Sequence, residues 1–217
     1  MKRITLFAGH YGSGKTNIAV NYALKLHKEG LPVHIADLDI VNPYFRTKDS
    51  ADELAQAGIE LISPAYANSN VDLPALPQEV YGLVQNKSIY AIMDIGGDER
   101  GALALGRYRP YILEENDFEM VFTANFYRPL TRSAEEAIEV MREIEIAGGI
   151  PFTAIVNNSN IGEETTPEDI KATFEEAEKL SRLTSLPIIF TSVKEDLVSS
   201  FEGQSILPLK LQKKIIN

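Results

Sequence analysis

The chain has 217 residues, 44% of them hydrophobic and 24% charged, which predicts one globular domain over residues 1–217 with a sizeable core. It has no cysteine, which excludes disulfides, thiolate metal sites and cysteine-held iron–sulfur clusters. The formal net charge of −10 argues against broad nucleic-acid binding, because such binding depends on Lys and Arg that neutralise phosphates.

We expect a cytoplasmic protein. The sequence has no run of about 18 apolar residues that could span a membrane. An apolar segment follows directly after Met1-Lys2-Arg3, so no signal peptide is expected. The segment 208–216 mixes apolar and basic residues, but it is too short for a stable isolated helix. We therefore expect it to pack on the domain and not to bind a membrane.

Apolar segments of strand type alternate with helical patterns along the chain. The strand candidates are 4–8, 33–37, 59–62, 89–94, 120–124, 152–156 and 188–191. One helix is predicted from the apolar face formed by Ala134, Ala137, Ile138, Met141 and Ile144. Another should begin at Thr166, with Pro167 in its first turn. This alternation predicts an α/β fold with a mostly parallel central sheet and helices on both faces.

Residues 9–16 read Gly-His-Tyr-Gly-Ser-Gly-Lys-Thr and match a phosphate-binding loop. The loop follows a predicted strand and precedes apolar residues at helical spacing, a context that a chance glycine-rich turn would lack. Its backbone N–H groups and the helix start would face a phosphate chain. Lys15 would reach the β- and γ-phosphates, and Thr16 would bind Mg²⁺. The expected nucleotide contacts are Gly9, His10, Tyr11, Gly12, Ser13, Gly14, Lys15, Thr16 and Asn17.

Carboxylates follow two more predicted strands, where an open parallel sheet forms its ligand crevice. Asp94 ends one strand and precedes Gly96 and Gly97. It would hold the Mg²⁺ shell, and Gly97 would turn its N–H toward the γ-phosphate. Asp94 could instead cap the next helix. After the second strand, one or both of Asp37 and Asp39 could orient the attacking water or bind the Mg²⁺ shell, while Asp37 could instead be a structural partner of Lys15 or of a loop amide.

These motifs resemble those of the MinD/ParA superfamily of P-loop ATPases. That group includes the nitrogenase iron protein, the nickel-insertion ATPases of carbon monoxide dehydrogenase and the cobyrinic acid diamide synthase type. The resemblance implies a P-loop NTPase fold and a Mg²⁺-dependent ATPase that often dimerises face to face around two nucleotides. It aligns residues 37–39 with the first switch, where Asp39 would position the attacking water, and residues 94–97 with the second.

Two further positions follow from the resemblance. Asn157 matches the asparagine that often reads adenine after a late strand, although a plain turn asparagine is equally compatible with its position. His10 stands where family members commonly carry a second lysine that reaches the partner's phosphates. A histidine cannot copy a long lysine, so we expect a weaker dimer. The sequence lacks an Asn-Lys-x-Asp guanine signature, which favours ATP.

Three functional classes stay open. The first, favoured by Asp39 and Gly97 together, is a nucleotide-driven switch or accessory ATPase that acts on a protein partner. The second is an ATP-dependent small-molecule enzyme, such as a kinase or an amide-forming synthase. The third is a nucleotide-binding module without hydrolysis. A substrate pocket for the second class could involve residues 63–77 with Arg100, Arg107 and Arg109, which equally fit a solvated face.

Overall fold

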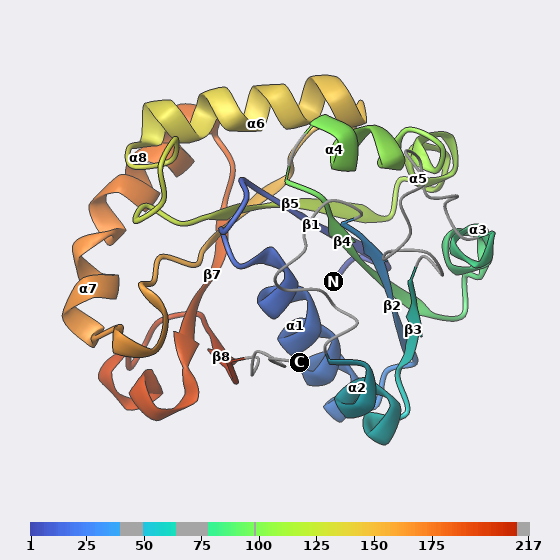
Figure 1. Ribbon diagram of the computed structural model, residues 1–217, viewed down its shortest axis with the longest axis horizontal. Coiled ribbons are helices and arrows are strands. Elements are labelled where there is room, and N and C mark those ends of the chain that lie inside the picture. Colours follow the sequence, from blue (N-terminus) through green and yellow to red (C-terminus); the bar gives the residue numbers. More distant parts are fainter. Residues whose placement is uncertain (40–49, 64–77, 98, 212–217) are drawn as a thin grey trace, which may run out of the picture.

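The computed structural model describes residues 1–39, 50–63, 78–97 and 99–211, and these residues build one central sheet. The sheet has the order β3-β2-β4-β1-β5-β6-β7-β8, and every neighbouring pair is parallel (Figure 1). The described strands are β1 (Ile4–Ala8), β2 (Val33–Leu38), β3 (Glu60–Ile62), β4 (Tyr90–Ile95), β5 (Phe118–Ala124), β6 (Ala154–Asn157), β7 (Ile188–Lys194) and β8 (Ile206–Leu209).

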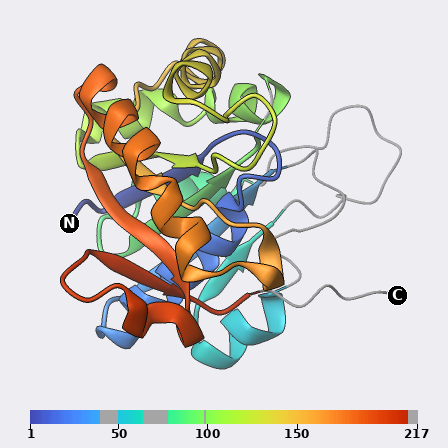
Figure 2. The same cartoon turned by 90° about the vertical axis from the view of Figure 1, so that its left-hand side faces the viewer.

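Helices cover both faces of the sheet (Figure 1 and Figure 2). The described helices are α1 (Lys15–Lys28), α2 (Ala51–Ala57), α3 (Glu79–Gln85), α4 (Glu99–Leu105), α5 (Arg109–Glu115), α6 (Ala134–Gly148), α7 (Pro167–Ala172) and α8 (Phe174–Thr184), with short 3₁₀ turns η2 (Gly162–Glu164) and η3 (Glu195–Ser200). Within the described ranges, no helix has the length and apolar character needed to cross a membrane.

The two larger hydrophobic cores lie on opposite faces of the sheet, because successive strand residues point to opposite faces. In β1, Leu6 belongs to the core beneath α3, α4, α5, α6 and α8, and its neighbour Phe7 belongs to the core beneath α1 and α2. The central strands are therefore buried on both faces and read as continuous apolar runs. The predicted α/β fold with a parallel sheet and two helical layers is confirmed.

The C-terminal strand β8 was not among the predicted strands. Residues Ile206–Leu209 form the edge strand of the sheet, so residues 208 and 209 pack on the domain as expected, and residues 212–216 lie outside the described ranges. The strand was not predicted because its sequence contains Pro208. Proline has no N–H to donate to a sheet and is tolerated only in an edge strand.

The end of β8 is fixed to α1 by one asparagine. The side-chain amide of Asn21 donates to the carbonyl of Lys210 over 3.1 Å and accepts the backbone N–H of Lys210 over 2.9 Å. The Lys210 ammonium pairs with Glu53 of α2 over 2.6 Å. The sheet edge is thus tied to both helices of one layer.

Candidate nucleotide-binding site

The predicted phosphate loop joins β1 to α1 at the carboxyl edge of the sheet, where parallel α/β proteins bind ligands. Gly14 immediately precedes α1 in the left-handed conformation, with φ +84°. A Cβ at this position would lie 2.3 Å from the side-chain nitrogen of Asn158. Only glycine meets both conditions without strain, which explains this part of the motif.

Lys15 lies at the centre of a buried cluster of charged groups. Its ammonium is 2.7 Å from Oδ2 of Asp39, and both side chains are only 3% exposed. The backbone N–H of Asp39 donates to Oδ1 of Asp37 over 3.0 Å. Asp37 is the register partner of Asp94 across the β2–β4 pair. The structure thus brings together the four charged residues that the sequence singled out on three separate segments.

The cluster perturbs two of its own members. Burial lowers the pKa of the Lys15 amine, but Asp39, Asp94 and Asp37 together more than offset this, so the pKa is raised and the amine stays charged. Burial, reinforced by Asp94 and Asp39, raises the pKa of Asp37 to about 8, against the opposing effects of the Asp39 N–H and Lys15. Asp37 therefore carries a proton near neutral pH and accepts a hydrogen bond from the Asp39 backbone.

Gly97 rests directly on the phosphate loop. A Cβ at Gly97 would lie 2.5 Å from the carbonyl oxygen of Gly9 and 2.9 Å from the backbone nitrogen of Tyr11. A residue with any side chain would displace one segment or the other. The backbone of the segment after β4 is therefore in direct contact with the loop.

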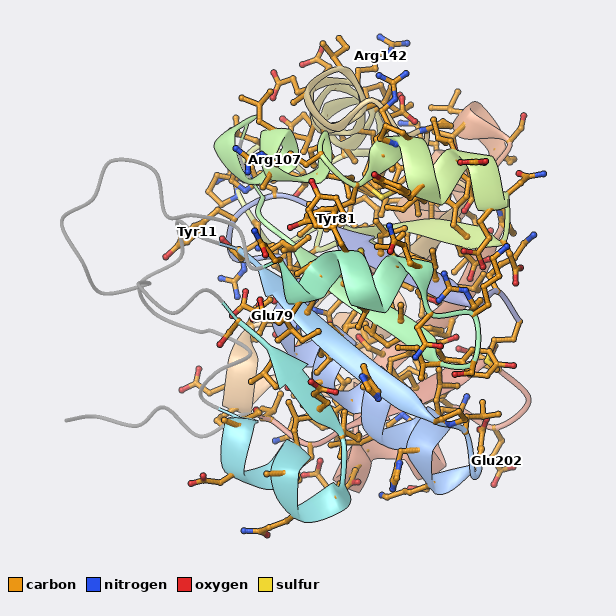
Figure 3. The ribbon with its side chains drawn as sticks, turned by 90° about the vertical axis from the view of Figure 1, so that its right-hand side faces the viewer. Tyr11, Glu79, Tyr81, Arg107, Arg142 and Glu202 are labelled. Carbon is orange, nitrogen blue, oxygen red and sulfur yellow. The ribbon has the colours of Figure 1, made fainter. Side chains whose placement is uncertain are left out.

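The other loop residues have varied surroundings. The His10 ring nitrogen Nδ1 is 2.9 Å from the carbonyl of Tyr11, and the Tyr11 side chain is 49% exposed (Figure 3). Ser13 is buried, and its hydroxyl has no hydrogen-bond partner among the described residues. Asn17 accepts hydrogen bonds from the Asn21 side chain through both its carbonyl and Oδ1, over 2.8 and 3.1 Å.

The residues at this edge fit a Mg²⁺ ion that is held mainly by a nucleotide. Thr16, in the first turn of α1, and Asp94 are buried and carry the oxygen ligands that Mg²⁺ prefers. Asp39 is less available, because Lys15 already pairs with one of its oxygens. In the part of the chain that the structure describes, no three His, Asp or Glu side chains could hold a metal. Mg²⁺ sites commonly use phosphates, waters and one or two carboxylates, so such a cage is not required.

Asn157 ends β6, and its side chain is fully buried. Its Nδ2 donates to the Thr173 hydroxyl over 3.0 Å. Its Oδ1 accepts the backbone N–H and the hydroxyl of Ser159 over 3.1 and 2.7 Å. The side chain therefore braces the turn after β6 against the start of α8. Adenine recognition by Asn157 stays a prediction.

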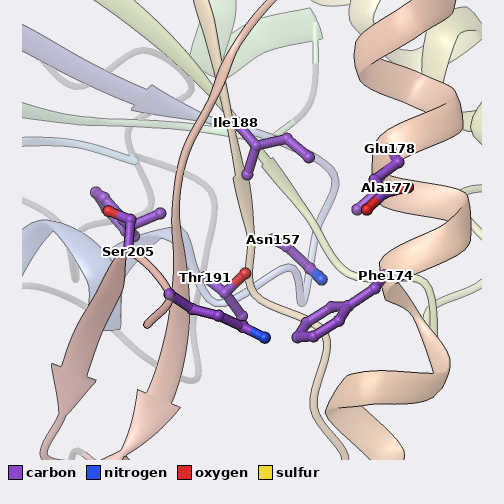
Figure 4. Close-up of a pocket in the computed structure, with 9 residues that line it drawn as sticks. Asn157, Phe174, Ala177, Glu178, Ile188, Thr191 and Ser205 are labelled. Carbon is purple, nitrogen blue, oxygen red and sulfur yellow. The ribbon is translucent and has the colours of Figure 1, made fainter. Parts of the chain in front are cut away.

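Asn157 also contributes to a pocket of about 310 Å³ between β7 and α8 (Figure 4). Phe174 and Glu178 come from α8, Thr191 comes from β7, and Gln204 precedes β8. The pocket opens on the face of the sheet that carries α8, whereas the phosphate loop leads into α1 on the opposite face.

The sequence analysis missed Asn158. This side chain is 2% exposed, and its Nδ2 donates to the carbonyl of Ser13 in the phosphate loop over 2.6 Å. Its Oδ1 accepts the hydroxyl of Ser192 in β7. Asn158 therefore connects the segments that follow β1 and β6 with β7. Its position directly after a strand, next to Asn157, was the only available signal.

The three arginines considered for a substrate pocket, Arg100, Arg107 and Arg109, are described only in part. Arg109 packs against Gly149 after α6, where a Cβ on Gly149 would lie 2.9 Å from the guanidinium. Arg107 is exposed in the turn before α5 (Figure 3). Residues 64–77 and the side chain of Arg100 lie outside the described structure.

Solved structures with the same fold are P-loop proteins. No protein-family model matches the chain, and no curated protein matches it either. The signal recognition particle receptor FtsY from Elizabethkingia anophelis in complex with GDP aligns with TM-score 0.56 and 13% identity over 98% of this chain and 61% of that chain. FtsY from Mycoplasma mycoides aligns with TM-score 0.60 and 16% identity over 90% of this chain and 61% of that chain.

A third match is the signal recognition particle 54 kDa protein from Aeropyrum pernix K1 in complex with GDP. It gives TM-score 0.51 and 14% identity over 87% of this chain and 40% of that chain. At these identities the likeness establishes the fold, which is that of the P-loop nucleoside triphosphatases. The chain spans only 61% of the length of the two FtsY structures.

The raised pKa of Asp37 predicts a pH-dependent stability. Between pH 3.8 and about 8 the native state holds a proton on Asp37 that the unfolded chain has released. The free energy of unfolding contributed by this group should therefore fall as the pH rises through that window. Asp37→Asn keeps an oxygen for the Asp39 N–H and removes the titration, so the variant should lose this dependence and be the more stable protein at alkaline pH.

The measurement is thermal unfolding of wild type and Asp37→Asn without nucleotide, from about pH 5 to about pH 9, the range that brackets most of the transition. The exposed Asp117→Asn variant serves as a control for the loss of one carboxylate. Parallel curves for wild type and Asp37→Asn would contradict the assignment.

Proposed function

We propose that this protein is a Mg²⁺-dependent ATP-binding protein with slow ATPase activity, which acts in the cytoplasm as a nucleotide-driven switch or accessory ATPase on a protein partner. The observation that carries the proposal is the buried Lys15 ammonium beside the phosphate loop, paired with Asp39. The P-loop NTPase fold supports nucleotide binding in general. The resemblance to MinD/ParA ATPases in the three nucleotide motifs supports the narrower assignment.

The Lys15–Asp39 pair suggests how binding and hydrolysis would be linked. A phosphate chain in the loop carries more negative charge than one carboxylate and would compete with Asp39 for the Lys15 ammonium. Asp39, released from that pair, would orient the water that attacks the γ-phosphate. Thr16 and Asp94 would hold Mg²⁺, which supplies positive charge to the phosphates. Gly97 would report the presence of the γ-phosphate through its contact with the loop.

One feature supports a partner, in the form of a second copy or another protein. Four apolar side chains are well exposed in loops at the carboxyl edge of the sheet: Tyr11, Tyr127, Leu130 and Ile161, with exposures of 49%, 37%, 62% and 46%. Exposed apolar groups that gather on one surface are typical of interaction sites. We propose that this surface, the apolar rim, mediates a nucleotide-dependent homodimer that lacks the crossed lysine, because His10 occupies its position in the loop.

The nucleotide-site assignment is tested by two substitutions with different expected effects. Lys15→Ala should weaken ATP binding about tenfold or more, because hydrogen bonds to charged groups contribute about 1.5–3 kcal/mol. Asp39→Ala should keep ATP bound and slow hydrolysis about a hundredfold, as expected when a group that acts on the attacking water is lost. Calorimetry with Mg²⁺ measures binding, and phosphate release measures hydrolysis.

Lys25→Ala is the matched control, because Lys25 is exposed on the same helix. Equal ATP affinity in wild type and Lys15→Ala would refute the site. A wild-type hydrolysis rate in Asp39→Ala would make Asp39 a structural residue. If hydrolysis in wild type rises with a small metabolite and with no protein, the chain is instead a small-molecule enzyme such as a kinase or an amide-forming synthase.

The choice of base is tested on two neighbouring asparagines. Asn157→Ala should weaken the binding of ATP more than the binding of GTP, because an amide matches the donor and acceptor of the adenine edge. Asn158→Ala should weaken both nucleotides by similar factors, since it releases the Ser13 carbonyl of the phosphate loop. Dissociation constants for ATP and GTP are compared in the two variants and wild type. An unchanged ratio in Asn157→Ala would leave that residue with its bracing role alone.

The dimer is tested by light scattering with Mg²⁺ and a non-hydrolysable ATP analogue. The mass should double from 24.1 kDa on addition of the analogue. Leu130→Asn, which keeps the left-handed backbone at φ +67° accessible, should weaken the dimer. Ile146→Ser, at an 84% exposed site on α6, should not. A protein that stays monomeric at all concentrations would rule out the homodimer.

A further inference from the structure

Arg128, which follows β5, donates a hydrogen bond from its guanidinium to the phosphate loop. Its Nε lies 3.0 Å from the carbonyl oxygen of Gly12. The contact joins residues 116 positions apart in the chain. The loop after β5 and the loop after β1 are neighbours at the carboxyl edge of the sheet, as Figure 2 shows in yellow-green and dark blue.

The backbone around Arg128 is held firmly. Asn125 is buried, its Oδ1 accepts the N–H of Tyr127 over 3.1 Å, and its carbonyl accepts the N–H of Arg128 over 3.1 Å. The Thr131 hydroxyl donates to the same carbonyl over 2.8 Å. The N–H of Phe126 donates to the Ser159 hydroxyl over 3.0 Å. These bonds fix the position from which the long arginine side chain reaches the phosphate loop.

The guanidinium retains most of its binding capacity. An arginine carries five N–H donors in a planar fork that suits phosphate oxygens, and Gly12 uses one of them. The Nη groups of Arg128 make no ion pair or hydrogen bond with any residue that the structure describes. The backbone N–H groups of such a loop face the phosphates, and the Arg128 guanidinium is bonded to that loop, so its Nη donors would lie near the proposed phosphate site.

The negative charge at the site exceeds what Lys15 alone can neutralise once a nucleotide binds. Lys15 is already surrounded by three carboxylates, and a nucleotide adds more negative charge. The loop position that carries a lysine in the MinD/ParA family holds His10 in this chain. Arginines supplied from the same chain or from a partner stabilise the charge that develops on a transferring phosphoryl group.

We propose that Arg128 is a catalytic residue that contacts the β- and γ-phosphates of the nucleotide in its own chain and takes the place of the missing second lysine. The inference rests on the proposed nucleotide hydrolysis. It assigns the site its second fixed cation and makes the loop after β5 part of the catalytic machinery. The alternative is that Arg128 only props the loop through its bond to Gly12.

The test compares Arg128→Met, Arg128→Lys and the control Arg132→Met, an exposed arginine four positions further along. Dissociation constants for the diphosphate and for a non-hydrolysable triphosphate, and the hydrolysis rate, are measured with the base that wild type prefers. Arg128→Met should slow hydrolysis at least about tenfold. It should also weaken binding of the triphosphate more than binding of the diphosphate, because the lost cation acts on the γ-phosphate. Arg128→Lys should recover part of both losses, because it restores the charge.

Three outcomes overturn the inference. Arg128→Met that behaves like Arg132→Met would show that the guanidinium has no role in hydrolysis. Equal weakening of both nucleotides with no recovery in Arg128→Lys would show that Arg128 only props the loop. Wild type that binds no nucleotide would overturn the proposed function itself, and the inference would fall with it. This result is distinguishable from failure of the Arg128 inference alone, because it is seen in wild type without any variant.

Discussion

The candidate site depends on one buried ammonium that faces three buried carboxylates. Ions removed from water are costly unless they are paired, and Lys15 pairs with Asp39 inside the protein. A second carboxylate, Asp37, avoids the cost of a buried unpaired charge because its raised pKa keeps it protonated. Lys15 is then the one positive charge that the cluster offers to a bound phosphate chain. This shortage of positive charge is the reason for the proposed roles of Mg²⁺ and Arg128.

Close glycine contacts connect this cluster to the outer helices. Gly97 touches the phosphate loop, and its neighbour Gly96 packs against Gly101 of α4, where an added Cβ would lie 2.6 Å from the Gly101 Cα. No side chain stands between these backbones to absorb a displacement. A shift of the loop would therefore be passed to α4 and to α6, which packs on it. That route leads from the nucleotide site to the outer surface of the helical layer.

The sequence predicted the parts of the fold and site that local patterns encode. The long apolar runs gave the central strands, and the loop motif with its flanks located β1, α1 and Lys15. The helices α2, α3, α4 and α5 each have seven residues, too few for a clear helical period, and β8 has four residues with a proline. Asn158 and Arg128 could not be predicted, because their contacts join loops 145 and 116 residues apart.

The pairing of Asn21 with Lys210 has a practical consequence. The side-chain amide of Asn21 engages both the N–H and the carbonyl of Lys210, as the peptide group of an adjacent strand would. The chain thus leaves the sheet edge while attached to α1, whose first residue is Lys15. A fluorophore introduced at residue 211 would be connected to α1 through the Asn21 amide and to α2 through the ion pair of Lys210 with Glu53. That position would suit an optical reporter of the proposed nucleotide binding.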